Sequence, residues 1–384
     1  MRLRELFETG AAPAATKKLG RAFNHLEDLV FFYGTKGTLE ALEHLKELNT
    51  AEGAQTLRMK WDGNPQIYWG RETAGGPLIL AGHNGWSKGA KTSSQTALQD
   101  FIANKSGSPK TPEEKTARDQ FAREFSGMYA MFDAATPKDF QGFVYADGLF
   151  LQQPKIDANN VYTFCPNPKS KTCYHVMSKS DLGMRIASAR VMVVGHAFFP
   201  EFGMADEDQE PIDDFEMFNG NPELIVLGPI YNVSTVALDT TEIDEVEAFL
   251  TQHAGEIDTF LADSPGLGDL KNIIYTYVNQ TAKAKQLDNI SSDHFISWLT
   301  TSKVSPGKQQ KIEEKINAAP TALDAIFELV NRIQTMKDHV IDQVEAGPKP
   351  EIWDTHGEGR VRYPGANKQF GKVKLVPRKR WTPA

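Results

Sequence analysis

The spacing of apolar residues changes several times along the chain and separates helical from strand-forming stretches. In residues 1–50 apolar positions recur every three or four residues, as at Leu39, Leu42 and Leu45, which predicts helices. After Gly53 short apolar blocks bounded by turn residues predict strands instead. These strands are expected at residues 57–61, 66–69, 78–81, 142–153, 161–164, 173–177, 190–199 and 224–227.

Helical spacing returns in residues 91–134 and again from about residue 242 to 344. Gly347-Pro348-Lys349-Pro350 ends the second stretch, and two more strands are expected after it, at 359–363 and 372–377. The pattern predicts an α+β fold in four segments: an N-terminal helical segment (1–50), a core (51–240), an all-α insertion (241–346) and strands that complete the core (347–384).

Composition limits the class of protein. The chain has 384 residues, of which 40% are hydrophobic, enough for two or three domains with a sizeable core. It lacks both an apolar run of the roughly 18 residues that a membrane span needs and a signal-peptide pattern. Cys165 and Cys173 are the only cysteines, which argues against a disulfide scaffold and for a reducing compartment. We therefore expect a cytoplasmic protein without a membrane partner.

Two other groups receive ordinary structural interpretations. Cys165, Cys173 and His175 match no standard zinc spacing, so the cysteines are interpreted as a pair flanking a hairpin. His196 lies in the apolar strand 190–199 and is interpreted as a satisfied core histidine.

The charge is unevenly distributed. The net charge of the chain is −8, but residues 358–384 carry eight Lys or Arg and one acid, a balance of +7. Such a basic end is either a solvated tail or a surface that faces phosphate groups.

One short stretch, Lys60-Trp61-Asp62-Gly63-Asn64-Pro65, suggests chemistry when it is combined with the basic end. Taken alone, Asp-Gly indicates an ordinary hairpin turn. However, a lysine amine can attack the α-phosphate of a nucleotide when it is deprotonated and the leaving pyrophosphate is neutralised. Lys372 and Lys374 are two residues apart, so in a strand they share one face, where they could neutralise phosphate and depress the pKa of Lys60.

This combination resembles the covalent nucleotidyltransferase superfamily, which includes the ATP-dependent DNA and RNA ligases and the mRNA capping enzymes. Lys60-Trp61-Asp62-Gly63 resembles the motif whose lysine becomes nucleotidylated, and residues 142–148 resemble the motif whose carboxylate, here Asp147, contacts the ribose. Strand 190–199 lies where the family carries an aromatic that stacks on the base, here Phe198 or Phe199. Glu358-Gly359-Arg360-Val361 resembles the metal-linked carboxylate motif, and Lys372-Val373-Lys374 resembles the phosphate-binding lysine pair.

The resemblance implies a set of site residues. Lys60, Lys372 and Lys374 would be catalytic, and Asp147 and Glu358 would hold Mg²⁺ or Mn²⁺. Lys88 or Lys91 would replace the basic residue that the family has between these motifs. The nucleotide-binding residues would be Met59, Asp62, Gly63, Asn64, Lys88, Asp147, Phe198 and Glu358.

The departures from the family pattern indicate a branch. Asp147 replaces the usual Glu, and Pro65 stands where DNA ligases and capping enzymes have an arginine, which favours the RNA-ligase branch. The chain ends ten residues after Lys374, which leaves no room for a C-terminal OB domain. The expected fold is an antiparallel-sheet adenylation core, ATP-grasp-like, with the helical insertion.

The expected function is ATP-dependent sealing of 5′-phosphate to 3′-hydroxyl ends through a lysine–AMP intermediate, with RNA preferred to DNA as the acceptor and host cytoplasm as the location if the chain is phage-encoded. Two alternatives remain open. One is GMP or AMP transfer to an RNA end or a protein, and the other is a non-catalytic structural or nucleic-acid-binding phage protein. The helical insertion could also bind RNA or a protein partner.

Overall fold

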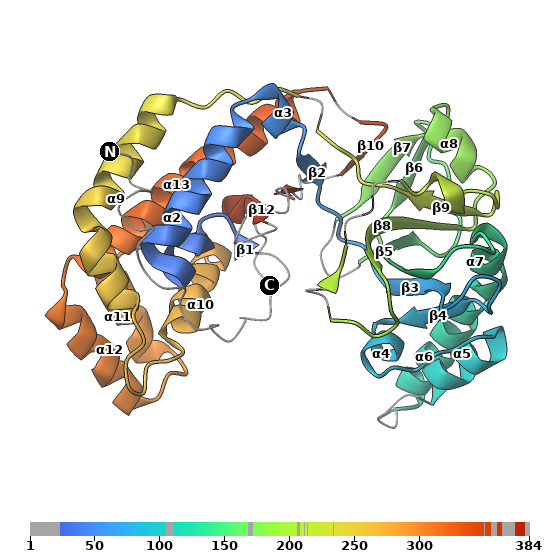
Figure 1. Cartoon of the computed structure of the whole chain (residues 1–384), viewed down its shortest axis with the longest axis horizontal. Helices are drawn as coiled ribbons and strands as arrows, with labels where there is room; N and C mark the ends of the chain where they lie inside the picture. The colour runs from blue at the N-terminus through green and yellow to red at the C-terminus, as the bar shows by residue number, and fades with distance from the viewer. Residues whose placement is uncertain are drawn as a thin grey trace. The chain divides into compact units, whose positions relative to one another are not determined.

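The computed structural model describes residues 24–104, 111–167, 172–205, 208–210, 212, 214–232, 234–348, 350–354, 359–362 and 373–380. The chain divides into two compact units (Figure 1). Unit 1 comprises Met1–Met59, Tyr231–Pro348 and Gly359–Ala384, and unit 2 comprises Lys60–Ile230 and Lys349–Glu358. Each unit therefore combines segments that are far apart in the sequence.

Unit 2 is built on a five-stranded sheet in the order β4-β3-β5-β8-β9. β8 and β9 pair in parallel, and the other neighbours are antiparallel. The strands are β3 (Gln66–Arg71), β4 (Ile79–Gly82), β5 (Gly142–Phe150), β8 (Val191–Phe199) and β9 (Leu224–Leu227).

The two faces of this sheet are covered differently because alternate residues of a strand point to opposite sides. Val144 and Ala146 of β5 share a core with Phe125 and Phe132, which come from the helices on that face. The helices that contribute to this core are α5 (Gln95–Ala103), α6 (Pro112–Ser126) and α7 (Tyr129–Ala135), whereas α4 (His83–Ser87) contributes to the other face. α5 and α6 are capped at their N-termini by Ser94 and Thr111, whose side chains accept hydrogen bonds from backbone N–H groups of the first turn.

The opposite face is aromatic. Tyr68 of β3 stacks on Trp86 at 4.4 Å between ring centroids and on Tyr145 at 5.0 Å. Phe143 and Phe199, a cross-strand pair, complete this second core. The Tyr145 end of the stack leads to the candidate site.

A second sheet of unit 2 has the order β10-β7-β6, with β6 (Val161–Phe164), β7 (Tyr174–Met177) and β10 (Ile352–Asp354). α8 (Asp181–Ile186) and η2 (Glu216–Phe218) also belong to this unit. Cys165 and Cys173 flank the β6–β7 hairpin, as predicted, and they form a disulfide. That bond departs from the reduced state expected of a cytoplasmic protein.

Unit 1 combines a small sheet with helices. The sheet has the order β1-β12-β11-β2, from β1 (Asn24–His25), β2 (Leu57–Met59), β11 (Arg360–Arg362) and β12 (Val373–Leu375). Figure 1 shows α2, α9 and α13 side by side. The helical elements are α2 (Asp28–Leu48), α3 (Ala51–Ala54), α9 (Thr240–Leu261), α10 (Leu270–Lys283), η3 (Leu287–Asn289), α11 (Ser292–Thr301), α12 (Pro306–Ala318), α13 (Ala322–Ala346) and η4 (Arg378–Arg380).

One hydrophobic core runs through unit 1. It contains Leu42 of α2, Leu250 of α9 and Val330 of α13 together with Leu57 and Val373 of the sheet. The helices predicted as an insertion therefore bury their apolar faces against the N-terminal helix and the C-terminal strands. Helical periodicity identified these helices but not their partners, so the four predicted segments differ from the two units.

A charged cluster is buried beside this core. Glu27 Oε1 accepts hydrogen bonds from Lys337 Nζ at 2.8 Å and from Arg378 Nη1 at 2.9 Å. Arg378 Nη2 donates to Asp28 Oδ2 at 2.9 Å. All four side chains are at most 1% exposed. The cluster thus joins the start of α2 to α13 and to η4.

The elements confirm the mixed α+β class and most of the predicted helices and strands. β10, α4, α8 and the two-residue β1 were not predicted, and α4 begins at His83, where a turn was expected. Within the described ranges, no helix combines the length and apolar character needed to cross a bilayer.

Candidate functional site

The segment that begins with Lys60 runs against the end of β5 in unit 2. Asn64 N donates to Gly148 O and Gly148 N donates to Pro65 O, both at 2.8 Å. A Cβ atom placed on Gly63 would lie 2.5 Å from Cβ of Asp147. The two sequence motifs, more than 80 residues apart, therefore form one site.

The same segment is also attached to the second sheet of unit 2. Asp62 N donates to the hydroxyl of Tyr174 at 2.7 Å, and Asn167 Nδ2 donates to Asp62 Oδ1 at 3.3 Å. Trp61 is buried and lies 5.0 Å from the ring of Tyr174. Lys60 is half-buried at the start of this fixed segment.

Asp147 accepts hydrogen bonds on both carboxylate oxygens. The Tyr145 hydroxyl lies 3.2 Å from Oδ1, and His196 Nε2 lies 3.1 Å from Oδ2. Gln66 Nε2 donates to the Tyr145 hydroxyl at 2.9 Å. The side chains of Asp147 and His196 are 14% and 19% exposed, so the carboxylate retains access to a ligand.

Tyr145 keeps its proton in this setting. Burial, together with the neighbouring Asp147 carboxylate, raises the pKa of Tyr145 above its ordinary value. Because its oxygen already accepts from Gln66, the hydroxyl hydrogen is available to Asp147.

A β-bulge places His196 beside Asp147. Tyr145 pairs with Ala197, whereas the next residue of β5, Ala146, pairs with Gly195. His196 is thus an extra residue in β8, and it joins Ala197 opposite Tyr145. Bulges of this kind redirect a side chain and recur beside functional sites.

The aromatic candidates separate onto different faces. Phe198 pairs with Val144, and its ring lies 6.1 Å from that of Phe140, so it belongs to the face opposite Asp147. Phe199 pairs with Phe143 on the Asp147 face, where it is buried against Tyr68. The structure therefore does not bring Phe198 together with Asp147.

Lys88 and Lys91 follow α4. This helix starts at His83, directly after Gly82, the partner of Ile67 in the sheet. Lys88 is exposed at the C-terminal end of α4, and Lys91 forms an ion pair with Glu72. Lys91 is thus paired within the protein.

The remaining predicted residues belong to the other unit or lie outside the described part of the chain. Met59 is buried at the end of β2, opposite Arg360, and Lys374 lies in β12, opposite Val361. β2 and β12 are both neighbours of β11, so the strand that leads into Lys60 and the strand that carries Lys374 share one sheet. Glu358 and Lys372 lie outside the described residues.

The basic C-terminal stretch is used largely within the protein. Arg378 is buried with Glu27 and Asp28, and Arg362 pairs with Glu47. Lys379 pairs with Asp288, and Arg380 pairs with Asp342 and Glu345. Four of the eight basic residues in this stretch thus pair with acidic residues of unit 1, and a surface that faces phosphate stays a prediction for this stretch.

The residues around Asp147 suit a ligand that donates a hydrogen bond to its carboxylate. Two donors already occupy part of the carboxylate, and its remaining lone pairs could accept a hydroxyl or an ammonium group. Among the residues that the structure describes, no three His, Cys, Asp or Glu side chains converge on a metal site. The Asp147–Glu358 metal site stays a prediction.

Sequence reasoning missed three members of the site: Tyr145, Gln66 and His196. Tyr145 could have been found, because it lies two residues before Asp147 in the same strand and therefore shares its face. His196 was interpreted as a core histidine, but it is partly exposed and bonded to Asp147. Only the bulge, which leaves no mark in the apolar pattern, brings it there.

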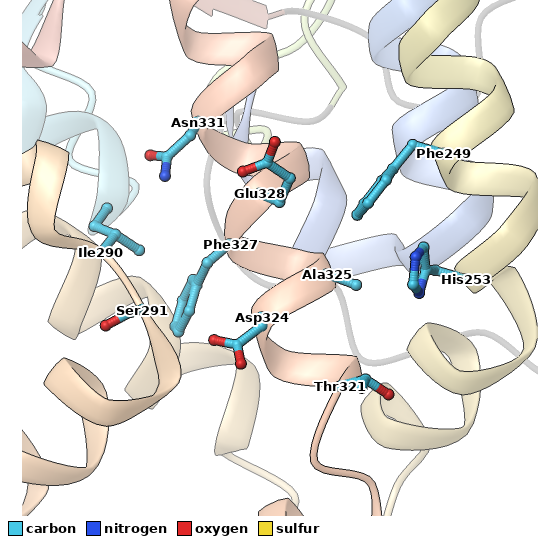
Figure 2. A pocket seen from close by; sticks show the side chains of 10 residues that line it. All are labelled: Phe249, His253, Ile290, Ser291, Thr321, Asp324, Ala325, Phe327, Glu328 and Asn331. Atoms are coloured by element: carbon cyan, nitrogen blue, oxygen red, sulfur yellow. The ribbon is translucent and has the colours of Figure 1, made fainter.

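A groove of 360 Å³ lies in unit 1, and none of the predicted site residues lines it (Figure 2). Phe249 and His253 of α9 stand opposite polar side chains of α13. Glu328 already accepts from Arg332 Nε at 2.6 Å, and His253 contacts Glu256. The lining residues are Phe249, His253, Ile290, Ser291, Thr321, Asp324, Ala325, Phe327, Glu328 and Asn331.

Comparison with known proteins identifies one family. No curated protein and no solved structure matches the chain. A family model described as a family of unknown function, DUF6267, matches residues 21–78 and 114–382. These ranges include the Lys60 segment, all of β5 and β8, and the C-terminal strands. Since the match covers well over half of the chain, the protein belongs to the DUF6267 family.

Proposed function

We propose that this protein is a lysine nucleotidyltransferase that forms a covalent Lys60–AMP intermediate and passes the AMP to the 5′-phosphate end of an RNA. One observation carries the proposal. The paired backbone hydrogen bonds between Asn64, Pro65 and Gly148 hold the lysine segment against β5, the strand that carries Asp147. A nucleophile and a ribose-binding carboxylate must lie around one nucleotide for such chemistry.

The proposed first step is a displacement at phosphorus. The deprotonated amine of Lys60 attacks the α-phosphorus of ATP, a nitrogen–phosphorus bond forms, and the bond to the β-phosphate oxygen breaks. The nitrogen, which carries two hydrogens when it attacks, releases one of them as a proton to solvent, and pyrophosphate leaves. A divalent cation bound to the phosphates would offset the charge of the leaving group.

The arrangement of the sheets supports the proposal. Antiparallel β3, β5 and β8 present Gln66, Asp147 and His196 at one end of the larger sheet. An adenylation core of the resembled superfamily requires such a carboxylate strand beside the lysine segment.

The choice of RNA as acceptor rests on the resemblance to the RNA-ligase branch. In the second step the 5′-phosphate of the acceptor would attack the lysine-bound AMP, and in the third a 3′-hydroxyl would displace AMP. The alternative transfer of GMP to an RNA end differs in the first nucleotide bound, so the same assay distinguishes the two.

The first experiment is a labelling test. The purified chain, first treated with pyrophosphate, is incubated with α-labelled ATP or GTP and Mg²⁺ and run on a denaturing gel. We expect label from ATP on the wild type and none on Lys60→Ala or Lys60→Arg. Alanine has no amine, and arginine keeps the positive charge but stays protonated at neutral pH and is therefore not a nucleophile.

A matched control uses a lysine on the other side of the sheet. Lys115 is exposed on α6 and pairs with Asp119, so Lys115→Ala should be labelled like the wild type. Label on Lys60→Ala, or none on any protein, would contradict the proposal. Sealing of a 5′-phosphorylated RNA would then test the acceptor.

A further inference from the structure

The hydrogen bonds around Asp147 leave it little freedom to rotate. Each carboxylate oxygen has its own donor, from Tyr145 on one side and His196 on the other. Each donor is in turn fixed: Gln66 orients the Tyr145 hydroxyl, and the bulge of β8 fixes the backbone of His196. A carboxylate held this way is preorganised, so little conformational entropy is lost in ordering it when a ligand binds.

The direction of each hydrogen bond can be worked out from the donors and acceptors. An ionised carboxylate only accepts, so Nε2 of His196 carries the hydrogen in this pair. Tyr145 accepts from Gln66 and donates to Asp147. Asp147 therefore receives two donated hydrogens and keeps two lone-pair positions for a third donor.

We infer that His196 and Tyr145 are positioning residues that hold the Asp147 carboxylate in the orientation in which it accepts a hydrogen bond from a ribose hydroxyl. The inference deepens the proposed function and rests on it for the identity of the ligand. The specificity that follows is for ribonucleotides over nucleotides that lack the bonded hydroxyl.

The ring contacts agree with a positioning role. The centroid of the His196 ring lies 5.2 Å from that of Tyr145, and Tyr145 stacks in turn on Tyr68. Tyr68 is 1% exposed and stacks on Trp86, which is 3% exposed. The partly exposed pair at Asp147 is thus supported from behind by rigid aromatic side chains.

The test measures binding without chemistry. In the Lys60→Ala background, calorimetry compares ATP with 2′-deoxy-ATP and 3′-deoxy-ATP, with the guanosine series in parallel. We expect the nucleotide that keeps the bonded hydroxyl to bind about 10-fold more tightly than the analogue that lacks it, as for one hydrogen bond to a charged acceptor.

The added variants separate positioning from folding. His196→Ala and Tyr145→Phe should each weaken ATP about 10-fold and leave the weaker deoxy analogue nearly unchanged, so that the discrimination disappears. His196→Gln, which retains a donor, should recover part of it. His175→Ala and Tyr129→Phe, on residues that do not contact Asp147, should keep the wild-type ratio.

Each outcome decides the inference independently of the labelling test. The positioning role is overturned by any of three results: His196→Ala weakens the binding of all nucleotides equally, it changes the binding of none of them, or no nucleotide binds at all. This holds even where Lys60 is labelled. If the discrimination is present and is lost in His196→Ala and Tyr145→Phe, the role stands, even where Lys60 takes no label.

Discussion

Gly63 marks the closest approach between the Lys60 segment and β5. A methyl group at this position would lie 2.5 Å from Cβ of Asp147 and 3.0 Å from the carbonyl oxygen of Gly148. Both neighbours belong to a strand held on each side by other strands, so the segment has to move away. A Gly here is required by space rather than by an unusual backbone conformation.

We therefore expect Gly63→Ala to lower the free energy of unfolding by about 1–3 kcal/mol, as overpacking does, and to abolish labelling. Denaturant unfolding followed by fluorescence would measure the first effect. Gly220→Ala is the control, because a Cβ there meets no atom within 4 Å. Equal stability of the two variants would mean that the segment does not pack on β5 as described.

At this scale the sequence revealed the residues that carry recognisable motifs. Lys60 and Asp147 were identified from the sequence, and the structure brings their segments together. Gln66 and Tyr174 were not, because an ordinary polar or aromatic residue in a strand gains a role only through its neighbours. Tyr174 reaches Asp62 from a strand more than 100 residues away.

The start of α2 shows how one element depends on charge. Burial raises the pKa of Asp28 to about 6, although Arg378 favours its charged form. In Glu27 burial also opposes ionisation, but Lys337 and Arg378 outweigh it and lower the pKa. Two adjacent carboxylates therefore titrate in opposite directions from their ordinary values.

A raised pKa in the folded state means that Asp28 stabilises the fold at low pH, and that this contribution is lost as the pH rises through about 6. We expect the difference in unfolding free energy, wild type minus Asp28→Asn, to fall by about 2–3 kcal/mol between pH 4 and pH 7. Denaturant unfolding at several pH values measures it.

Glu27→Gln serves as the control with the opposite sign. The pKa of Glu27 is lowered in the folded state, so Glu27 stabilises the fold above its ordinary pKa of 4.5, and this contribution is lost as the pH falls. The difference in unfolding free energy, wild type minus Glu27→Gln, should therefore grow with pH. Parallel trends for the two variants would rule out the assignment.

The elements themselves were largely readable from apolar spacing, since a helix or strand needs a buried face of the right period. The bulge in β8 and strand β10 were not. β10 has three residues and pairs with β7 about 175 positions earlier, as in Ile352 with Val176. Three residues are too few to show an alternation of apolar and polar positions, so this strand can be recognised only from its pairing with β7.

In the whole molecule, Arg378 joins parts of the chain that are 350 positions apart. It is fully buried and compensates both Glu27 and Asp28. Removing one partner of a buried ion pair leaves an uncompensated charge, so we expect Arg378→Met to lower the free energy of unfolding by about 3–5 kcal/mol.

Lys379→Met is the neighbouring control, since Lys379 is 50% exposed and its pair with Asp288 is screened by solvent. We expect it to change stability by less than about 1 kcal/mol. Thermal unfolding of both variants is the measurement, and a small effect of Arg378→Met would show that the cluster is replaceable.

The arrangement of the whole chain was the part least accessible to sequence reasoning. Apolar stripes on α9 and α13 require a partner, but nothing in a stripe says that Leu42 of α2 or Val373 of β12 supplies it. The predicted insertion is in fact the main body of a unit that also includes the N-terminal helix.

The division of the chain has a consequence for its synthesis. The chain passes from one unit to the other after residues 59, 230, 348 and 358, so neither unit is a continuous stretch. β2 emerges from the ribosome about 300 residues before its partner β11, and β12 follows later still. Unit 1 therefore cannot be completed when α2 and α9 have been synthesised. Residues 373–380, which complete its sheet and neutralise Glu27 and Asp28, are made only later. Such long-range closure is slow, so during synthesis the apolar faces of unit 1 stay without their C-terminal partners until the end of the chain has been made.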